Sequence, residues 1–265
     1  MIIKKEIHSN LKSLIIWAIV LISFAWMIAP FIDYVLNDSQ SLKEFINMMP
    51  KFMLKAFTDN IDSLFTPQGF FNVKIMMMAE IFTAIFSIMT AASIFAHEFE
   101  KKTIEYILIK PINRKQLYQK KVYALFLIYL IFAMIFWISI LILFKIYVHY
   151  PYDVKILSSF ALYLFVTEVF FGSITAMLSV IYQRNFMPIS ITMGIFVFML
   201  IGDMLGNVME SINWIRYFSI FKYISSNSTV ATGKIYLFNS LIIIIISIGL
   251  IFTGQYIFEK KDISI

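Results

Sequence analysis

Six long apolar runs constrain the fold of this 265-residue chain more than any other feature of its sequence. They cover roughly 14–36, 73–96, 122–148, 157–182, 187–206 and 235–258. A helix needs about 20 apolar residues to cross the hydrocarbon core of a bilayer. Lipid excludes an open strand, because its unpaired backbone groups would find no water there. The runs therefore predict an all-α, polytopic membrane protein with a single transmembrane domain over residues 1–265.

The composition supports a lipid-facing surface and excludes several kinds of site. The chain is 60% hydrophobic and 14% charged, whereas soluble domains are nearer 45–50% apolar and about 25% charged. It has no cysteine, which excludes disulfides, thiolate metal sites and a cysteine nucleophile. Its three histidines lie outside the long apolar runs. We expect no metal site, and the net charge of +6 favours basic loops at a membrane over nucleic-acid binding.

The first apolar run has two interpretations. Its basic start, with Lys4, Lys5 and Lys12, is compatible with a signal peptide. However, the apolar stretch is too long for the core of a signal peptide, and no small-x-small cleavage site follows it. A retained first helix is the better interpretation. Most of the 22 Lys and Arg residues then lie in short segments on the side of the termini, which predicts a cell-membrane protein with both termini cytoplasmic.

Two predicted outer loops carry apolar residues at helical spacing. The residues are Leu42, Phe45, Ile46 and Met49 in the loop 37–72, and Trp214, Tyr217, Phe218 and Phe221 in the loop 207–234. This spacing predicts short amphipathic helices at the outer interface. Such helices could either pack as a cap over the helix ends or gate a substrate path. The fifth run before the second loop is the least regular, since glycines and Asp203 interrupt it.

The segment between the second and third runs predicts a short amphipathic helix from Glu98 to Leu108. Its apolar stripe is formed by Ile104, Ile107 and Leu108 at i, i+3 and i+4. Pro111 ends this helix, because the residue before a proline avoids the α region. Asn113 can cap the next helix, with Gln116 at the third position completing a capping-box-like arrangement.

The next predicted helix is longer than a membrane span requires. From Arg114 to Val148 it has 35 residues, or about 52 Å at 1.5 Å per residue, whereas the hydrocarbon core is about 30 Å thick. Its first turns should project into the cytosol. The amphipathic helix, the proline corner and the long helix then form a rigid lever below the membrane. The alternative is an ordinary charged loop at the membrane surface.

This segment resembles the signature of type-2 ABC transporter permeases, the six-span membrane subunits of bacterial ABC exporters. In that family an acidic residue after the second span is followed by Gly-Thr, a Leu pair, Pro, Arg and, before the third span, Lys. The matching residues, in the same order, are Glu100, Thr103, Ile107-Leu108, Pro111, Arg114 and Lys120 or Lys121. Lys102 stands where the family has glycine.

The resemblance implies a permease that forms a homo- or heterodimer and docks P-loop ATPase subunits. The coupling residues that it implies are Glu98, Glu100, Thr103, Ile107, Leu108, Pro111 and Arg114. It also implies an N-terminal elbow helix from Ile2 to Lys12. Ile3 and Ile7 in that stretch share a face with Leu14 just after it, opposite Lys4, His8 and Lys12.

ATP hydrolysis is expected in a partner chain. The sequence lacks Gly-x-x-x-x-Gly-Lys-[Ser/Thr], and its single Gly-Lys pair, Gly233-Lys234, is followed by Ile235. The glycine-rich loop that cradles phosphates is therefore missing. We expect this chain to hold no cofactor and not to be an enzyme itself, with ATP and Mg²⁺ bound by the partner ATPase.

Three carboxylates fall within predicted spans: Glu80, Glu168 and Asp203. An ionised group at mid-bilayer costs on the order of 2.5–3.5 kcal/mol or more, and no Lys or Arg lies in the middle of a span to offset it. They could line a substrate or cation pathway. Alternatively, they could act as polar contacts between helices, and Asp203 could simply cap its span.

The leading hypothesis is therefore the permease subunit of an ATP-driven exporter of unidentified substrate. The alternative is a secondary transporter coupled to protons or ions through Glu80 and Glu168. An intramembrane protease would need a Ser-His pair, an Asp pair or a histidine cluster at depth, and the sequence offers none of these.

Overall fold

The computed structural model describes residues 2–38, 61–96 and 113–261, and within these ranges it contains helices and no strand. Six helical segments in this described part of the chain are long and apolar enough to cross a membrane, which confirms the predicted number of spans and the all-α class. They are Ile2–Asn37, Pro67–Phe95, Arg114–Tyr147, Val154–Tyr182, Phe186–Val208 and Leu237–Lys260.

The first two segments are composite. The first consists of α1 (Ile2–Ile28), the 3-10 turn η1 (Ala29–Phe31) and α2 (Ile32–Asn37). The second consists of α5 (Pro67–Phe71), the π-helical turn η3 (Asn72–Met76) and α6 (Met77–Phe95). The break in the first segment coincides with Pro30, which has no N–H to donate. Thr66 begins the second segment by accepting a hydrogen bond from the Gly69 N–H at 3.1 Å.

The other four segments are single helices: α9 (Arg114–Tyr147), α10 (Val154–Tyr182), α11 (Phe186–Val208) and α14 (Leu237–Lys260). Short elements complete the described chain, namely η2 (Ile61–Phe65), η4 (Glu210–Phe218), α12 (Ile220–Tyr223) and α13 (Ser226–Thr232). The predicted long helix is present, since α9 has 34 residues. Asn113 caps it through the Lys115 N–H rather than through Gln116 as a capping box would require.

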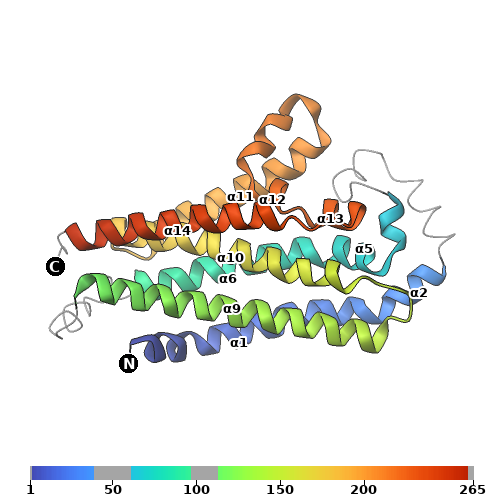
Figure 1. The fold of residues 1–265 in the computed structure, drawn as a ribbon, viewed down its shortest axis with the longest axis horizontal. Helices are drawn as coiled ribbons and strands as arrows, with labels where there is room; N and C mark the ends of the chain where they lie inside the picture. Colours follow the sequence, from blue (N-terminus) through green and yellow to red (C-terminus); the bar gives the residue numbers. More distant parts are fainter. Residues whose placement is uncertain (1, 39–60, 97–112, 262–265) are drawn as a thin grey trace.

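The long helices α1, α6, α9, α10 and α14 run side by side along the long axis of the molecule (Figure 1). The first and last described residues lie at the same end of this bundle, which we call the terminal end, and α13 lies toward the opposite, distal end. The central helix is α10. Of the residues in its most apolar stretch, 78% are buried, whereas the value is 22% for both α11 and α14. The outer faces of α11 and α14 carry exposed Val, Ile, Leu and Phe, as a lipid-facing surface requires.

The N-terminal stretch is continuous with the first span, so the separate elbow helix is not confirmed. In α1 the residues Lys4, His8 and Lys12 are exposed, as the pattern predicted. Glu6 and Asn10 are buried on the same face as Leu14, a polar start to the buried stripe that the apolar pattern did not indicate. The Asn10 side chain donates to the Glu6 carbonyl at 2.9 Å, which satisfies it locally.

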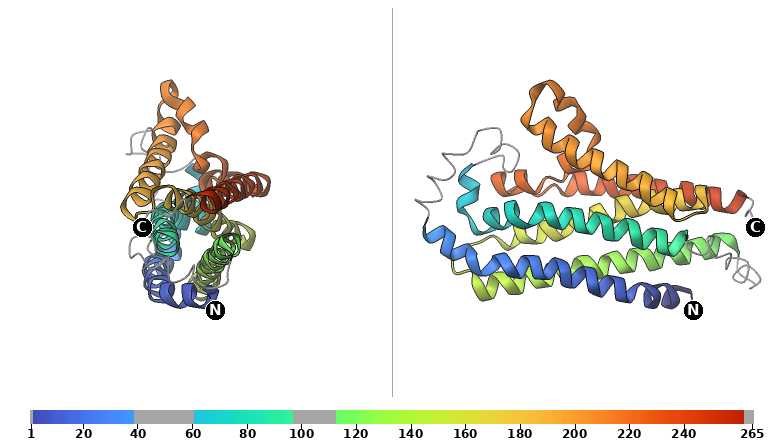
Figure 2. Two further views of the ribbon diagram at one scale, coloured as in Figure 1. Left: turned by 90° about the vertical axis from the view of Figure 1, so that its left-hand side faces the viewer. Right: turned by 180° about the vertical axis from the view of Figure 1, so that it is seen from behind.

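The helix α11 diverges from the bundle and, together with η4, projects from its side (Figure 2). The chain folds back because α11 carries Gly202 and Gly206 where η4 packs. A β-carbon on Gly202 would lie 2.7 Å from Ile215 Cγ2, and one on Gly206 would lie 2.5 Å from Arg216 Cγ. Both distances are too short for a real contact. The glycines that make the fifth run irregular in sequence are therefore the ones that admit η4.

The amphipathic prediction for residues 207–234 is confirmed only in part. This stretch does form short helical elements, η4, α12 and α13. The side chains of Trp214, Tyr217 and Phe218 are each more than half exposed, whereas Phe221 is buried. The counterpart predicted for Leu42, Phe45, Ile46 and Met49 lies outside the described residues.

Candidate functional site

At the terminal end, basic side chains bind the last carbonyls of three helices. The Lys121 Nζ donates to the Ile94 carbonyl at 2.5 Å, near the end of α6. The Arg114 Nη1 donates to the Lys261 carbonyl at 3.0 Å, just after α14. Lys261 Nζ in turn donates to the Ile181 carbonyl at the end of α10. The last carbonyls of a helix lack intrahelical partners and carry partial negative charge, so these three contacts tie the terminal end together.

Lys120 and Lys121 are the two candidates for the lysine before the third span, and they differ in burial. The Lys121 side chain is 3% exposed and lies over the Phe95 ring, whereas Lys120 is exposed. Of the predicted coupling residues, Arg114 is placed in this network. Glu98, Glu100, Thr103, Ile107, Leu108 and Pro111 lie outside the described residues, and their coupling role stays a prediction.

Near the distal end, a cavity of about 70 Å³ lies among α6, η3, α11, η4 and the start of α13. That volume holds a few water molecules or one small ion with water. Its polar lining is formed by Asn72, Glu80, Asp203, Asn207, Arg216 and Asn227, with Ser225 and Ser226. Two of the three predicted carboxylates, from helices about 120 residues apart in the chain, thus line one cavity.

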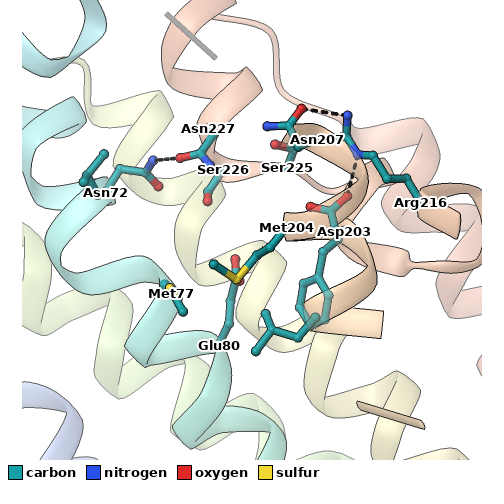
Figure 3. A pocket seen from close by; sticks show the side chains of 13 residues that line it. Asn72, Met77, Glu80, Asp203, Met204, Asn207, Arg216, Ser225, Ser226 and Asn227 are labelled. Carbon is teal, nitrogen blue, oxygen red and sulfur yellow. Dashed lines mark hydrogen bonds and ion pairs between the residues drawn. The ribbon is translucent and has the colours of Figure 1, made fainter. Parts of the chain in front are cut away.

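Two hydrogen-bonded groups flank the cavity (Figure 3). On one side the Asn72 Nδ2 donates to the Asn227 Oδ1 at 2.6 Å. On the other side the Arg216 Nε donates to the Asp203 carboxylate at 3.0 Å, and the Arg216 Nη1 donates to the Asn207 Oδ1 at 2.9 Å. The Glu80 side chain reaches from α6 into the space between the two groups.

The ion pair with Arg216 stabilises the Asp203 carboxylate within the fifth span. The Asp203 and Arg216 side chains are 21% and 18% exposed, respectively, so the pair is largely shielded from solvent. Asp203 does more than cap its helix, because its carboxylate pairs with a cation on the returning η4. The sequence places Arg216 in a predicted outer loop and does not indicate that it pairs with Asp203. The two meet only because η4 packs back against α11 at Gly202 and Gly206.

Glu168 lies elsewhere, in the centre of the bundle on α10. It is completely buried, and neither carboxylate oxygen has a hydrogen-bond partner among the described residues. Nearby, Tyr129 of α9 packs against Gly172, one turn further along α10, and donates to the Ser87 carbonyl of α6 at 2.6 Å. Thr83 is one turn back from Ser87 on α6 and is likewise buried without a partner in the described part of the chain.

The arrangement suits binding and helix positioning better than covalent chemistry. In the described ranges no three His, Cys, Asp or Glu side chains gather closely enough to hold a metal ion. The polar groups are instead carboxylates, amides and one guanidinium at helix contacts. Such groups can bind a small polar or charged species and can change partners when helices move.

A sequence model of the family described as "ABC-2 family transporter protein" matches residues 1–263, nearly the entire chain. The chain belongs to the ABC-2 transporter family. This ABC-2 protein is therefore a membrane transport component with several transmembrane helices. The family inferred from the order Glu100, Thr103, Pro111 and Arg114 is confirmed. No curated protein and no solved structure matches the chain.

Of the polar residues that line the ABC-2 protein's distal cavity, the sequence analysis identified only Glu80 and Asp203, and it missed Asn72, Arg216 and Asn227 among others. Asn72 stands at the first position of the π-helical turn, a rare feature that is frequent at functional sites. Nothing in the local sequence marks such a turn. Only the glycine pair of α11, spaced four residues apart, hinted that a second segment packs closely there.

Proposed function

We propose that this chain is the permease subunit of an ATP-driven ABC exporter whose ATPase is a separate chain. The observation that carries the proposal is the match of residues 1–263 to the ABC-2 family. The lack of a phosphate-binding loop in this sequence supports a separate P-loop ATPase that binds ATP and Mg²⁺.

The terminal end supports a mechanical connection to such a partner. The segment 97–112 joins α6 to α9, and both helices are anchored beside it, α6 through Lys121 and α9 through Arg114. A force applied to this segment would act on the last turns of α6, α10 and α14 together, since Lys121, Arg114 and Lys261 join their ends. We propose that Glu98 to Leu108 forms the coupling helix that contacts the ATPase.

Orientation and assembly follow from the same proposal. The first and last described residues lie at one end of the bundle, as six spans require, and the basic bias supports a cytoplasmic location for this end. The exposed apolar faces of α11 and α14 offer surface to lipid and to a second permease subunit. A secondary transporter is the weaker candidate, because the family match favours the ATP-driven class.

Co-purification with a P-loop ATPase tests the proposal. The chain alone should bind no nucleotide, and ATP-dependent transport in proteoliposomes should require both chains.

Glu100→Lys and Thr103→Pro should reduce ATPase association and transport while membrane insertion is unchanged. Proline inside the short helix would remove a hydrogen bond and cost about 3 kcal/mol. Lys43→Ala, between the first two spans, is the control and should leave association intact. Tight ATP binding by the isolated chain, or normal association and transport in both variants, would contradict the proposal.

A further inference from the structure

The distal cavity has more acidic than basic side chains in its lining. It is lined by two carboxylates, Glu80 and Asp203, and by one cation, Arg216. Arg216 already binds the Asp203 carboxylate and the Asn207 amide oxygen. The other basic side chain on the neighbouring turn, Lys74, is exposed and lies 5.9 Å from the centre of the Phe70 ring. With both carboxylates ionised, the lining carries one negative charge more than Arg216 neutralises. The cavity then has room for one further positive charge that would balance it.

A second observation points to a ligand independently of the carboxylates. Asn72 is 3% exposed and lines the cavity, and its Oδ1 has no hydrogen-bond partner among the described residues. Its Nδ2 is held by Asn227, which fixes the amide plane. A buried acceptor without a partner costs about as much as a lost hydrogen bond. A bound cation would accept its lone pairs.

We propose that the cavity formed by Asn72, Glu80, Asp203 and Asn227 is a binding site for a single monovalent cationic group. Oxygen ligands from a carboxylate and carboxamides suit hard cations and ammonium groups. A divalent ion is disfavoured, because it prefers six to eight oxygens with several carboxylates, and one of the two carboxylates here is already paired with Arg216. The cavity volume of about 70 Å³ fits an alkali ion with water or a primary ammonium group.

The site joins elements that a transport cycle can separate. Asn72 and Glu80 lie on the second span, Asp203 on α11, and Asn227 on α13. A cation bridging them would stabilise the arrangement in which α11 and α13 are close to α6. Binding does not depend on ATP coupling, so the inference stands apart from the proposed function and can be tested on the permease alone.

Equilibrium binding of ²²Na⁺ to the purified full chain in detergent tests the site. We expect saturable binding that unlabelled NaCl displaces and the bulky cation N-methylglucamine does not. Methylammonium chloride distinguishes an alkali ion from an ammonium group as the ligand. If it displaces ²²Na⁺, the site also binds ammonium groups. If it does not, the site binds inorganic cations alone. Glu80→Gln should weaken binding about tenfold or more, as expected for the loss of one charge-assisted contact.

Two further variants and a control complete the experiment. Asn72→Ala should weaken binding about fivefold, as expected for one neutral contact. Asn227→Ala keeps the Asn72 oxygen but frees its side chain, and should have a smaller effect. Glu259→Gln, an exposed carboxylate on α14, should bind as the wild type does. Each variant is first checked for a single, monodisperse species. No saturable ²²Na⁺ binding, or wild-type affinity in monodisperse Glu80→Gln and Asn72→Ala, overturns the inference.

Discussion

Replacing Gly172 with alanine should separate the three helices that meet at Tyr129. A β-carbon at this position would overlap the Tyr129 hydroxyl and would lie 2.6 Å from Cε2 and 2.8 Å from Cζ of the ring. The ring cannot withdraw easily. It is 1% exposed, its hydroxyl is bonded to Ser87, and Phe86 packs edge-on against it with 6.3 Å between ring centres.

The size of the effect follows from three contributions. Overpacking of a filled core costs about 1–3 kcal/mol. Displacing the Tyr129 hydroxyl from the Ser87 carbonyl adds about 1 kcal/mol, the net value of a typical hydrogen bond. Alanine is a better helix former than glycine by roughly 1 kcal/mol, which offsets part of the loss. The expected net destabilisation is about 1–3 kcal/mol.

The free energy of unfolding, measured by titrating SDS into detergent micelles that hold the protein, is the quantity to compare. Gly194→Ala is the matched control: it is a glycine inside α11 whose β-carbon would meet nothing within 4 Å. It should be neutral or stabilising by up to about 1 kcal/mol. The double variant Gly172→Ala with Tyr129→Leu should lose less stability than the sum of the two single variants, because the clash is gone.

The reasoning would be refuted if Gly172→Ala were as stable as the wild type in the same titration. Strictly additive losses in the double variant would also contradict it, because they would mean that Tyr129 and position 172 do not touch.

Three other predictions concern the charged contacts and the topology. Lys121→Met should destabilise the protein by about 1–3 kcal/mol, because it removes a buried charge-assisted bond, while exposed Lys120→Met should change the same unfolding free energy by less than about 0.5 kcal/mol. Arg216→Met should cost about 1–3 kcal/mol by leaving Asp203 without its cation, and adding Asp203→Asn should restore part of that loss; an additive double variant would show that the pair is uncoupled. Reporter fusions after Lys12 and at Ile265 should report the same, cytoplasmic side, and a reporter signal from opposite sides would contradict six spans.

The sequence alone determined the six-helix class, because lipid leaves a long apolar run no alternative to a helix. It also determined the length of α9, since no proline or glycine interrupts 114–147. The family was accessible from the order of a few residues around Pro111. Each of these properties depends on neighbours close in the chain, so periodicity and composition carry the information.

The partners of the charged residues were decided only by the tertiary structure. Asp203 pairs with Arg216 because Gly202 and Gly206 leave room for η4 to pack back against α11. Lys121 found the end of α6, and Glu80 came to share a cavity with Asn72 and Asn227, residues on two other elements. A carboxylate in an apolar run shows that a partner or a wet cavity is needed. Which residue supplies it depends on how helices pack, and that is set by side-chain shape at contacts between segments that are 13 residues apart for Asp203 and Arg216 but 155 apart for Asn72 and Asn227.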